Sequence, residues 1–389
     1  MTHQQYDVAG LGNAIVDVIA SVDDRFLLTH RIAKGGMTLI DEFRAKELLK
    51  ALADNQQTMS SLHEVAGGSA ANTLAGLASL GGNGVYVGKV FDDRLGAVFA
   101  KSMSAQGITF TTHPTRQGST TASCLIAVTP DGQRSMSTYL GACRELAPDD
   151  VDEEQVASAR ILYIEGYLWD EESAKQASRK AIAAVKGAGG KIALSLSDAF
   201  CVGRFRDEFL HLLDRDVNIL FANEEEAKAL FEAEDFDGVV AGAQKWGGVA
   251  ALTRSAKGCV LVEEGMVHTI PAAPVVSITC AGGMAGTSCT VPSSTITQPL
   301  AERVRAAMPP QALAWATTAS KLSSSNSALA SSSLAKTMLR SLCKRPRNSS
   351  RKRPTQNASD SDRAMRPPAC FTAAMALREA CLALSSSHR

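Results

Sequence analysis

Short apolar runs of strand length alternate with amphipathic, helix-like segments over most of this chain. Residues 6–19 read as a strand, a glycine turn and a second strand. From about residue 159 strands and helices alternate at short intervals, which predicts right-handed βαβ units and a mostly parallel sheet covered by helices. The other runs are, for strands, VYVGKVF (85–91), SCLIAVT (123–129), ARILYIEGYL (159–168), KIALSLS (191–197), VNILFAN (217–223) and GCVLVEEG (258–265), and, for helices, SAANTLAGLASLG (69–81), SAKQASRKAIAAVKGAG (173–189) and EEEAKALFEA (224–233).

Two segments, 14–40 and 108–140, are richer in alternating, strand-like runs. They predict a small β-sheet lid over the carboxyl edge of the main sheet, where ligands bind in open α/β folds. The expected fold class is therefore α/β, with a Rossmann-like central sheet flanked by helices and a small lid. The periodic pattern stops after Val276, which sets the expected domain at 1–276.

The net charge of zero hides a strong asymmetry along the chain. Lys and Arg number 25 before Ser277 and 15 from there on, whereas Asp and Glu number 36 and 4. Residues 277–389 are thus basic and Ser-rich, and we expect them to be disordered or poorly packed. The run KRPRNSSRKRP (344–354) is a candidate contact for nucleic acid. A shortage of aromatics and of any folded pattern favours a solvated tail, so nucleic acid is not an expected partner.

Several protein classes are disfavoured by composition. No run of about 18 apolar residues indicates a membrane span, and no basic region precedes the first apolar run, as it would in a signal peptide. The nine cysteines contain no C-x-x-C pair, which fits reduced thiols in the cytoplasm. The oligomeric state stays open.

Two candidate binding groups lie in the first hundred residues. Asp17 sits inside the apolar run AIVDVI, where an unpaired carboxylate is costly. A sugar diol would satisfy it; the alternative is a strand-edge acid facing water. Gly67 and Gly68 precede a helix whose first turns carry Asn72, and they allow close approach of a ligand. The alternative is an ordinary loop-to-helix start.

Two further candidates would handle phosphate. Asn223 and Glu226 have the spacing of a capping box; the other interpretation is an amide and a carboxylate that steer magnesium through water. Arg134 follows a Pro-Asp-Gly turn and could clamp a phosphate, or simply be a solvated hairpin arginine.

Seven stretches occur in order along the chain: GNAIVDVIA, KGGMTLID, AGGSAANTLAGLASLGG, GKVFDDRLG, TPDGQRSMSTYLGA, IEGYLWD and FANEEEA. Together they resemble the ribokinase-like (PfkB) family of carbohydrate and nucleoside kinases, and most closely its bacterial adenosine-kinase-like branch. The resemblance implies ATP and Mg2+ as cofactors and phosphorylation of a hydroxyl on a small nucleoside or sugar. It implies Asn13, Asp17, Gly67, Gly68 and Asn72 around the acceptor, Arg134 near the transferred phosphate, and Asn223 and Glu226 near magnesium.

The resemblance fails where this family carries Asp-Thr-x-Gly-Ala-Gly-Asp, whose last Asp is the general base and whose glycines open an anion hole. Residues 277–284 read SITCAGGM, so Gly282 and Gly283 remain and neither Asp does. A reading-frame slip near 277–286 would explain the change. Codons for Gly286 to Pro292, read from each third base, allow Asp-Phe-Leu-Tyr-Gly-Ser, and Phe-Leu-Tyr-Gly follows the loop in this branch.

The expected function is ATP-dependent phosphorylation of adenosine, impaired in this chain because the catalytic base is missing. Two alternatives stay open. One is another PfkB-type sugar kinase, acting on ribose or fructose, and the other is a non-catalytic nucleoside-binding protein.

Overall fold

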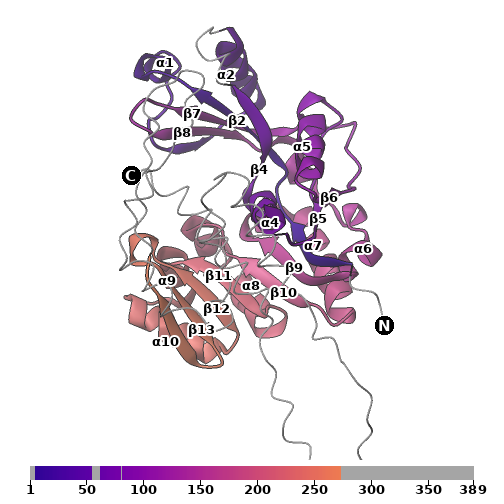
Figure 1. Cartoon of the computed structure of the whole chain (residues 1–389), viewed down its shortest axis with the longest axis vertical. Helices are drawn as coiled ribbons and strands as arrows, with labels where there is room; N and C mark the ends of the chain where they lie inside the picture. The colour runs from indigo at the N-terminus through magenta and orange to yellow at the C-terminus, as the bar shows by residue number, and fades with distance from the viewer. Residues whose placement is uncertain (1–4, 55–61, 80, 273–389) are drawn as a thin grey trace, which may run out of the picture. The chain divides into compact units, whose positions relative to one another are not determined.

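The structure is a computed structural model that describes residues 5–54, 62–79 and 81–272 (Figure 1). These residues build two β-sheets with helices packed against them. The tail 277–389 lies outside the described residues, as do the final residues of the expected domain. The expected disorder of residues 277–389 therefore stays a prediction.

The larger sheet confirms the expected mostly parallel α/β fold. In the described residues it has nine strands in the order β14-β13-β12-β11-β10-β9-β1-β5-β6. Pairing is parallel from β6 to β12, and the last two pairs at the other edge are antiparallel. The strands are β1 Tyr6–Leu11, β5 Gly84–Val87, β6 Thr109–Phe110, β9 Ala159–Glu165, β10 Lys191–Ser195, β11 Ile219–Asn223, β12 Val249–Thr253, β13 Cys259–Glu263 and β14 Met266–Ile270.

Amphipathic helices join and cover these strands. In α7 the buried Ala174, Ala177, Ala181 and Val185 recur every three or four residues, so one stripe faces β9 and β10. The same core cluster continues from the sheet into the later helices. The helices are α4 Ser69–Ser79, α5 Arg94–Ala105, α6 Glu153–Ala157, α7 Glu172–Gly187, α8 Ala199–Arg215, α9 Glu224–Phe231 and α10 Phe236–Trp246, with short 3-10 turns η1 Gly141–Glu145, η2 Pro148–Asp150, η3 Gly166–Asp170 and η4 Ser255–Lys257.

The smaller sheet confirms the expected second β-element. It has five strands in the order β3-β8-β7-β2-β4. One face is buried and includes Val16, Val18 and Leu125, and α2 packs against β7 and β8 (Figure 1). We call it the lid sheet. Its elements are β2 Ile15–Ser21, β3 Met37–Leu39, β4 His63–Gly67, β7 Ala122–Val128 and β8 Arg134–Tyr139, with helices α1 Asp24–Thr29 and α2 Glu42–Asp54.

Some expected boundaries were wrong, for local steric reasons. The segments 14–40 and 108–140 miss β4, and the second includes β6, which belongs to the larger sheet. The run 85–91 ends as a strand at Val87, and at the next residue, Gly88, an added Cβ would lie 2.7 Å from the Gly12 carbonyl oxygen. The run 159–168 turns into η3 at Gly166, where an added Cβ would lie 2.7 Å from the Leu196 carbonyl oxygen.

The described part of the chain offers no helix that is both long and apolar enough to cross a bilayer. Cys124, Cys143 and Cys201 are buried thiols. The cytoplasmic location stays a prediction.

Candidate functional site

The chain crosses between its two sheets at glycine-rich turns, and the acceptor-side candidates gather there. The β1–β2 turn holds Asn13, and the turn from β4 into α4 holds Gly67 and Gly68. Gly68 has φ +89°, and a Cβ added to it would lie 2.4 Å from the Asn13 carbonyl oxygen. A side chain at Gly68 would therefore be both strained and obstructed. At Gly68 the backbones of the two turns lie in close contact.

Asp17 lies against the same turns. A Cβ at Gly67 would be 2.2 Å from Cγ of Asp17, so the carboxylate packs directly on the glycine backbone. Burial raises the pKa of Asp17 to about 6, and the positive charge of Arg134 opposes the rise. A desolvated carboxylate in this position is suited to accept hydrogen bonds from the hydroxyls of a ligand.

Asn72 is exposed on the first turns of α4, and its backbone N–H donates to the Gly68 carbonyl at 3.0 Å. The helix therefore continues directly from the glycine turn. Asn13, Asp17, Gly67, Gly68 and Asn72 thus form one group in the structure, which we call the acceptor cluster.

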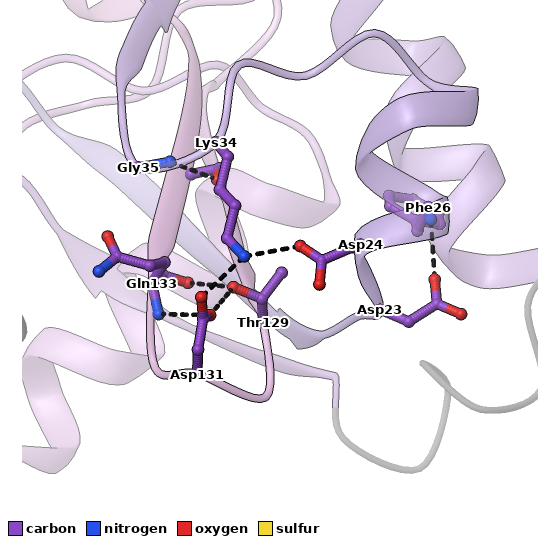
Figure 2. A network of polar contacts seen from close by, with 9 residues as sticks. Asp23, Asp24, Phe26, Lys34, Gly35, Thr129, Asp131 and Gln133 are labelled. Carbon is purple, nitrogen blue, oxygen red and sulfur yellow. Dashed lines mark hydrogen bonds and ion pairs between the residues drawn. The ribbon is translucent and has the colours of Figure 1, made fainter.

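Arg134 begins β8, at the end of the β7–β8 hairpin, and is exposed. A network of polar contacts holds this hairpin to the segment before β3 (Figure 2). Lys34 Nζ lies 2.7 Å from carboxylate oxygens of both Asp24 and Asp131. The backbone N–H of Gly35 donates to Ser135 Oγ at 3.0 Å. The network fixes the turn of the hairpin, next to Arg134.

The lid sheet presents a second, less buried face around Asp17. Directly opposed residues of neighbouring strands share a face, and the register through Asp17 reads Val65, Asp17, Cys124, Thr138 and Leu39. The next row on that face is His63, Ile19, Ile126, Met136 and Met37. Met37 and Leu39 are 53% and 60% exposed. This face, which we call the open lid face, is apolar apart from a few polar groups.

Glu165 lies against the acceptor cluster, and sequence reasoning missed it. It ends β9, is 1% exposed, and its two oxygens accept from the backbone N–H groups of Asn13 at 2.7 Å and Ala70 at 3.0 Å. Burial raises the pKa of the Glu165 carboxyl to about 7, and hydrogen bonds from Asn13 and Ala70 oppose the rise. The signal was present, because a lone acid ends the apolar run ILYIE.

Asn223 and Glu226 form the capping box that their spacing predicts. The Asn223 Oδ1 accepts from the Glu226 N–H at 2.8 Å, and Glu226 Oε2 accepts from the Asn223 N–H at 2.9 Å. Glu226 Oε1 also accepts from Asn223 Nδ2 at 2.7 Å. They end β11 and begin α9.

A direct metal site does not fit this pair. Glu226 is 2% exposed and both its oxygens already accept hydrogen bonds. Within the described ranges no three His, Cys, Asp or Glu side chains are grouped as metal ligands. A carboxylate held in this way would act on magnesium only through water, as an outer contact that orients the waters of the ion.

The structure thus brings the acceptor cluster together with Glu165 and puts Arg134 within electrostatic reach of Asp17. Asn223 and Glu226 form a separate pair at the end of β11. Gly282 and Gly283 lie outside the described residues.

Comparison with known proteins gives a consistent family. The model of the pfkB family carbohydrate kinases matches residues 29–284. Among curated proteins, the adenosine kinase of Saccharomyces cerevisiae is 27% identical over 231 residues, which cover 58% of this chain and 66% of that protein. The guanosine-inosine kinase of Escherichia coli is 25% identical over 234 residues, 59% of this chain and 53% of that protein. The chain therefore spans about half to two thirds of these relatives.

Two solved structures are closer in sequence. The adenosine kinase from Sinorhizobium meliloti is 45% identical with a TM-score of 0.61, covering 70% of this chain and 81% of that one. A protein described as a probable sugar kinase from Rhizobium etli is 40% identical with a TM-score of 0.63, covering 71% and 81%. The two names disagree on the acceptor.

Proposed function

Because the chain belongs to the pfkB family of carbohydrate kinases, we propose that its acceptor cluster binds a purine nucleoside, with adenosine first. In this proposal Asp17 accepts hydrogen bonds from the ribose diol, and the 5′ hydroxyl is the group to be phosphorylated by ATP. The names of relatives in yeast, Escherichia coli and Sinorhizobium meliloti support a nucleoside.

The observation that carries the choice of a nucleoside is the open lid face. A free sugar is polar on every side, and it would leave the apolar row of Ile19, Ile126 and Met136 in contact with water. A purine base is flat and largely apolar, so its contact with such a row is favourable at about 25 cal/mol for each Å² removed from water. Asp17 lies in the neighbouring row, which suits a ligand with a diol attached to a base.

Arg134 and the pair Asn223 and Glu226 would serve the phosphates in this proposal. Arg134 would pair with the transferred phosphoryl group as a charged donor. Glu226 would orient waters around Mg2+, which when bound neutralises charge on the ATP phosphates. Asp17 lies near Arg134 in the described residues, so the acceptor and the phosphate clamp would share one region.

We further propose that this chain phosphorylates its acceptor slowly. Residues 277–284, SITCAGGM, supply no carboxylate where the family places its general base. Loss of a general base costs about 10²–10⁴-fold in rate. The acceptor cluster is made of residues between Asn13 and Asn72, so in this proposal binding survives where turnover does not.

Calorimetry and a coupled ADP-release assay on the full chain test both statements. We expect adenosine to bind at least about tenfold more tightly than ribose or fructose, a difference of about 1.4 kcal/mol. We expect turnover far below the roughly 1–100 s⁻¹ that is typical of kinases. Equal binding of ribose would favour a sugar kinase, and ordinary turnover would refute the impairment. Binding without turnover would make the chain a nucleoside-binding protein.

Resequencing the gene tests the proposed reading-frame slip separately. A confirmed frame that encodes residues 277–389 as written would refute it. A corrected frame that restores Asp-Thr-x-Gly-Ala-Gly-Asp should yield a protein with ordinary kinase turnover.

A further inference from the structure

Both backbone crossings at the acceptor cluster are tied to one side chain. The first crossing leaves β1 and enters β2 through Asn13, and the second leaves β4 and enters α4 before Ala70. Glu165 Oε1 accepts from the first at 2.7 Å and Oε2 from the second at 3.0 Å. The carboxylate itself belongs to neither crossing, because it stands at the end of β9.

The fit around this carboxylate is tight. A Cβ at Gly12 would lie 2.5 Å from Glu165 Oε2 and 2.6 Å from the Ala70 Cβ. The parallel register of β1 and β9 pairs Leu11 with Ile164, so the turn after β1 is delivered beside Glu165. Sheet pairing therefore places the turn, and the carboxylate oxygens then determine where its N–H groups point.

The environment makes this carboxylate expensive to bury. In the part of the chain that the structure describes, the titratable groups that interact with it include the hydroxyls of Tyr86 on β5 and Tyr167 on η3 and the thiol of Cys143 on η1. Burial raises the pKa of Tyr86 and of Cys143 as well. A buried carboxylate persists in such surroundings when its hydrogen bonds offset the desolvation. Those bonds go to the two crossings.

We propose that Glu165 is a positioning residue that holds the two crossings in register and so sets the geometry of the acceptor cluster. The proposal rests on the proposed function, since it concerns the same nucleoside site. Glu165 acts through the backbone: the Asn13 carbonyl packs on Gly68, the Gly68 carbonyl accepts from the Asn72 N–H, and Gly67 packs on Asp17. A shift at either anchored N–H moves the surface on which Asp17 rests.

Two variants of the full chain separate positioning from simple packing. Glu165→Gln keeps the shape and one acceptor oxygen, whereas Glu165→Ala removes both. Glu145→Gln is the matched control, because the Glu145 Oε1 also accepts from a backbone N–H, that of Ser119 at 2.8 Å, outside the acceptor cluster. Adenosine affinity is measured by calorimetry. Amide hydrogen exchange of peptides covering 10–16 and 68–72 is measured without ligand.

We expect adenosine affinity to fall at least tenfold in Glu165→Ala and by an intermediate factor in Glu165→Gln. Amide exchange should accelerate at 10–16 and 68–72 in both Glu165 variants, while peptides in α7 and α8 should exchange as in the parent chain. The control Glu145→Gln should leave adenosine affinity and amide exchange unchanged. If Glu165→Ala fails to fold, Glu165→Gln decides. Affinity within twofold of the parent, or unchanged exchange in both segments, overturns the proposal. If the parent chain binds no adenosine, the proposed function fails and the exchange arm still tests Glu165.

Discussion

The buried carboxylate of Asp17 destabilises the folded chain but is suited to bind a ligand. Its carboxylate is packed on Gly67, and its pKa is raised to about 6 from 3.8 because burial disfavours the ionised form. At neutral pH the folded chain must nevertheless hold it charged. A group kept in an unfavourable state by its surroundings is typical of a binding site, where a ligand supplies the missing hydrogen bonds.

Replacing Asp17 by Asn should therefore stabilise the chain and weaken ligand binding. The raised pKa corresponds to roughly 1–3 kcal/mol of destabilisation at pH 7.5, which an uncharged amide would avoid. This gain in stability should vanish by about pH 3.5, which is below both the folded-state pKa of Asp17, about 6, and its ordinary pKa of 3.8. Urea denaturation at the two pH values measures it, and adenosine affinity should fall at least tenfold by calorimetry. A variant less stable than the parent at pH 7.5 would contradict this reasoning.

Gly67 and Gly36 provide a matched pair for the steric claim. A Cβ at Gly67 would lie 2.2 Å from Cγ of Asp17, whereas one at Gly36 meets nothing within 4 Å. Gly67→Ala should displace Asp17, destabilise the chain by about 1–3 kcal/mol as overpacking does, and abolish measurable adenosine binding. Gly36→Ala should change neither. Equal effects of the two substitutions on thermal unfolding and on affinity would show that the contact at Gly67 is unimportant.

At the scale of single residues, the sequence points to candidates where a residue type disagrees with the surrounding pattern. Asp17 is a candidate because it interrupts an apolar strand, and the Gly67–Gly68 pair because glycines precede a helix. Glu165 has the same signature, but it was read as an ordinary part of an expected strand. Its partners are backbone N–H groups 152 and 95 residues away, and side-chain pattern does not predict such contacts.

The first turn of α9 shows how one element can satisfy two interpretations. Asn223 caps the helix and Glu226 closes the capping box, as their spacing indicates. The same helix N-terminus follows β11 at the carboxyl edge of the larger sheet, where ligands of α/β folds bind. The capping box is observed, and the water-mediated contact with magnesium belongs to the proposed function.

A second N-cap, on the neighbouring helix α10, allows the capping role of Asn223 to be tested apart from a role in nucleotide binding. Asp235 caps α10 by accepting from the Gly238 N–H at 2.8 Å. Asn223→Ala and Asp235→Ala should each cost about 0.5–2 kcal/mol of stability in urea denaturation. Asn223→Ala alone should weaken binding of the magnesium complex of ATP in calorimetry. Equal nucleotide affinity in the two variants would leave Asn223 as a cap without a role in binding.

Elements with a clear period were predicted well, and short ones were not. The alternation after residue 159 gave β9, β10 and β11 with α7 and α9 between and after them. The strand β4 was missed because HEVAG is short, half-exposed and ends in the glycine pair. Its place in the lid sheet comes from pairing with β2, which is a tertiary contact.

For the whole molecule, the two buried carboxylates set a dependence of stability on pH. The folded-state pKa values of Glu165, about 7, and Asp17, about 6, exceed their ordinary values of 4.5 and 3.8. Through these two groups the folded chain binds more protons than the unfolded chain between roughly pH 4 and pH 7, so their contribution to stability falls as pH rises through this window.

Glu165→Gln should remove its share of this dependence. The parent chain should lose roughly 3 kcal/mol more than the variant between pH 4.5 and pH 7.5. Urea denaturation of both proteins at the two pH values gives the difference, in which contributions from other groups cancel. Parallel pH profiles of the two proteins would contradict a raised pKa at Glu165.

The family and the fold were predictable from the order of motifs along the chain, and the family match and the two-sheet structure confirm them. The acceptor was not, because ribose, fructose and nucleosides suit the same diol-binding residues. In the proposed function the open lid face separates them, and this face exists only once β2, β3, β7 and β8 are paired in register.

The place of β1 in the larger sheet has a consequence for the chain while it is being synthesised. This first strand lies between β5 and β9, and β9 follows it by about 150 residues along the chain. At roughly 5–20 residues per second of synthesis, β1 waits about 8 to 30 s for that neighbour to be made. During that interval at least one edge of the apolar strand β1 has no neighbouring strand to pair with. Chaperones that bind nascent chains would then have the greatest opportunity to bind β1.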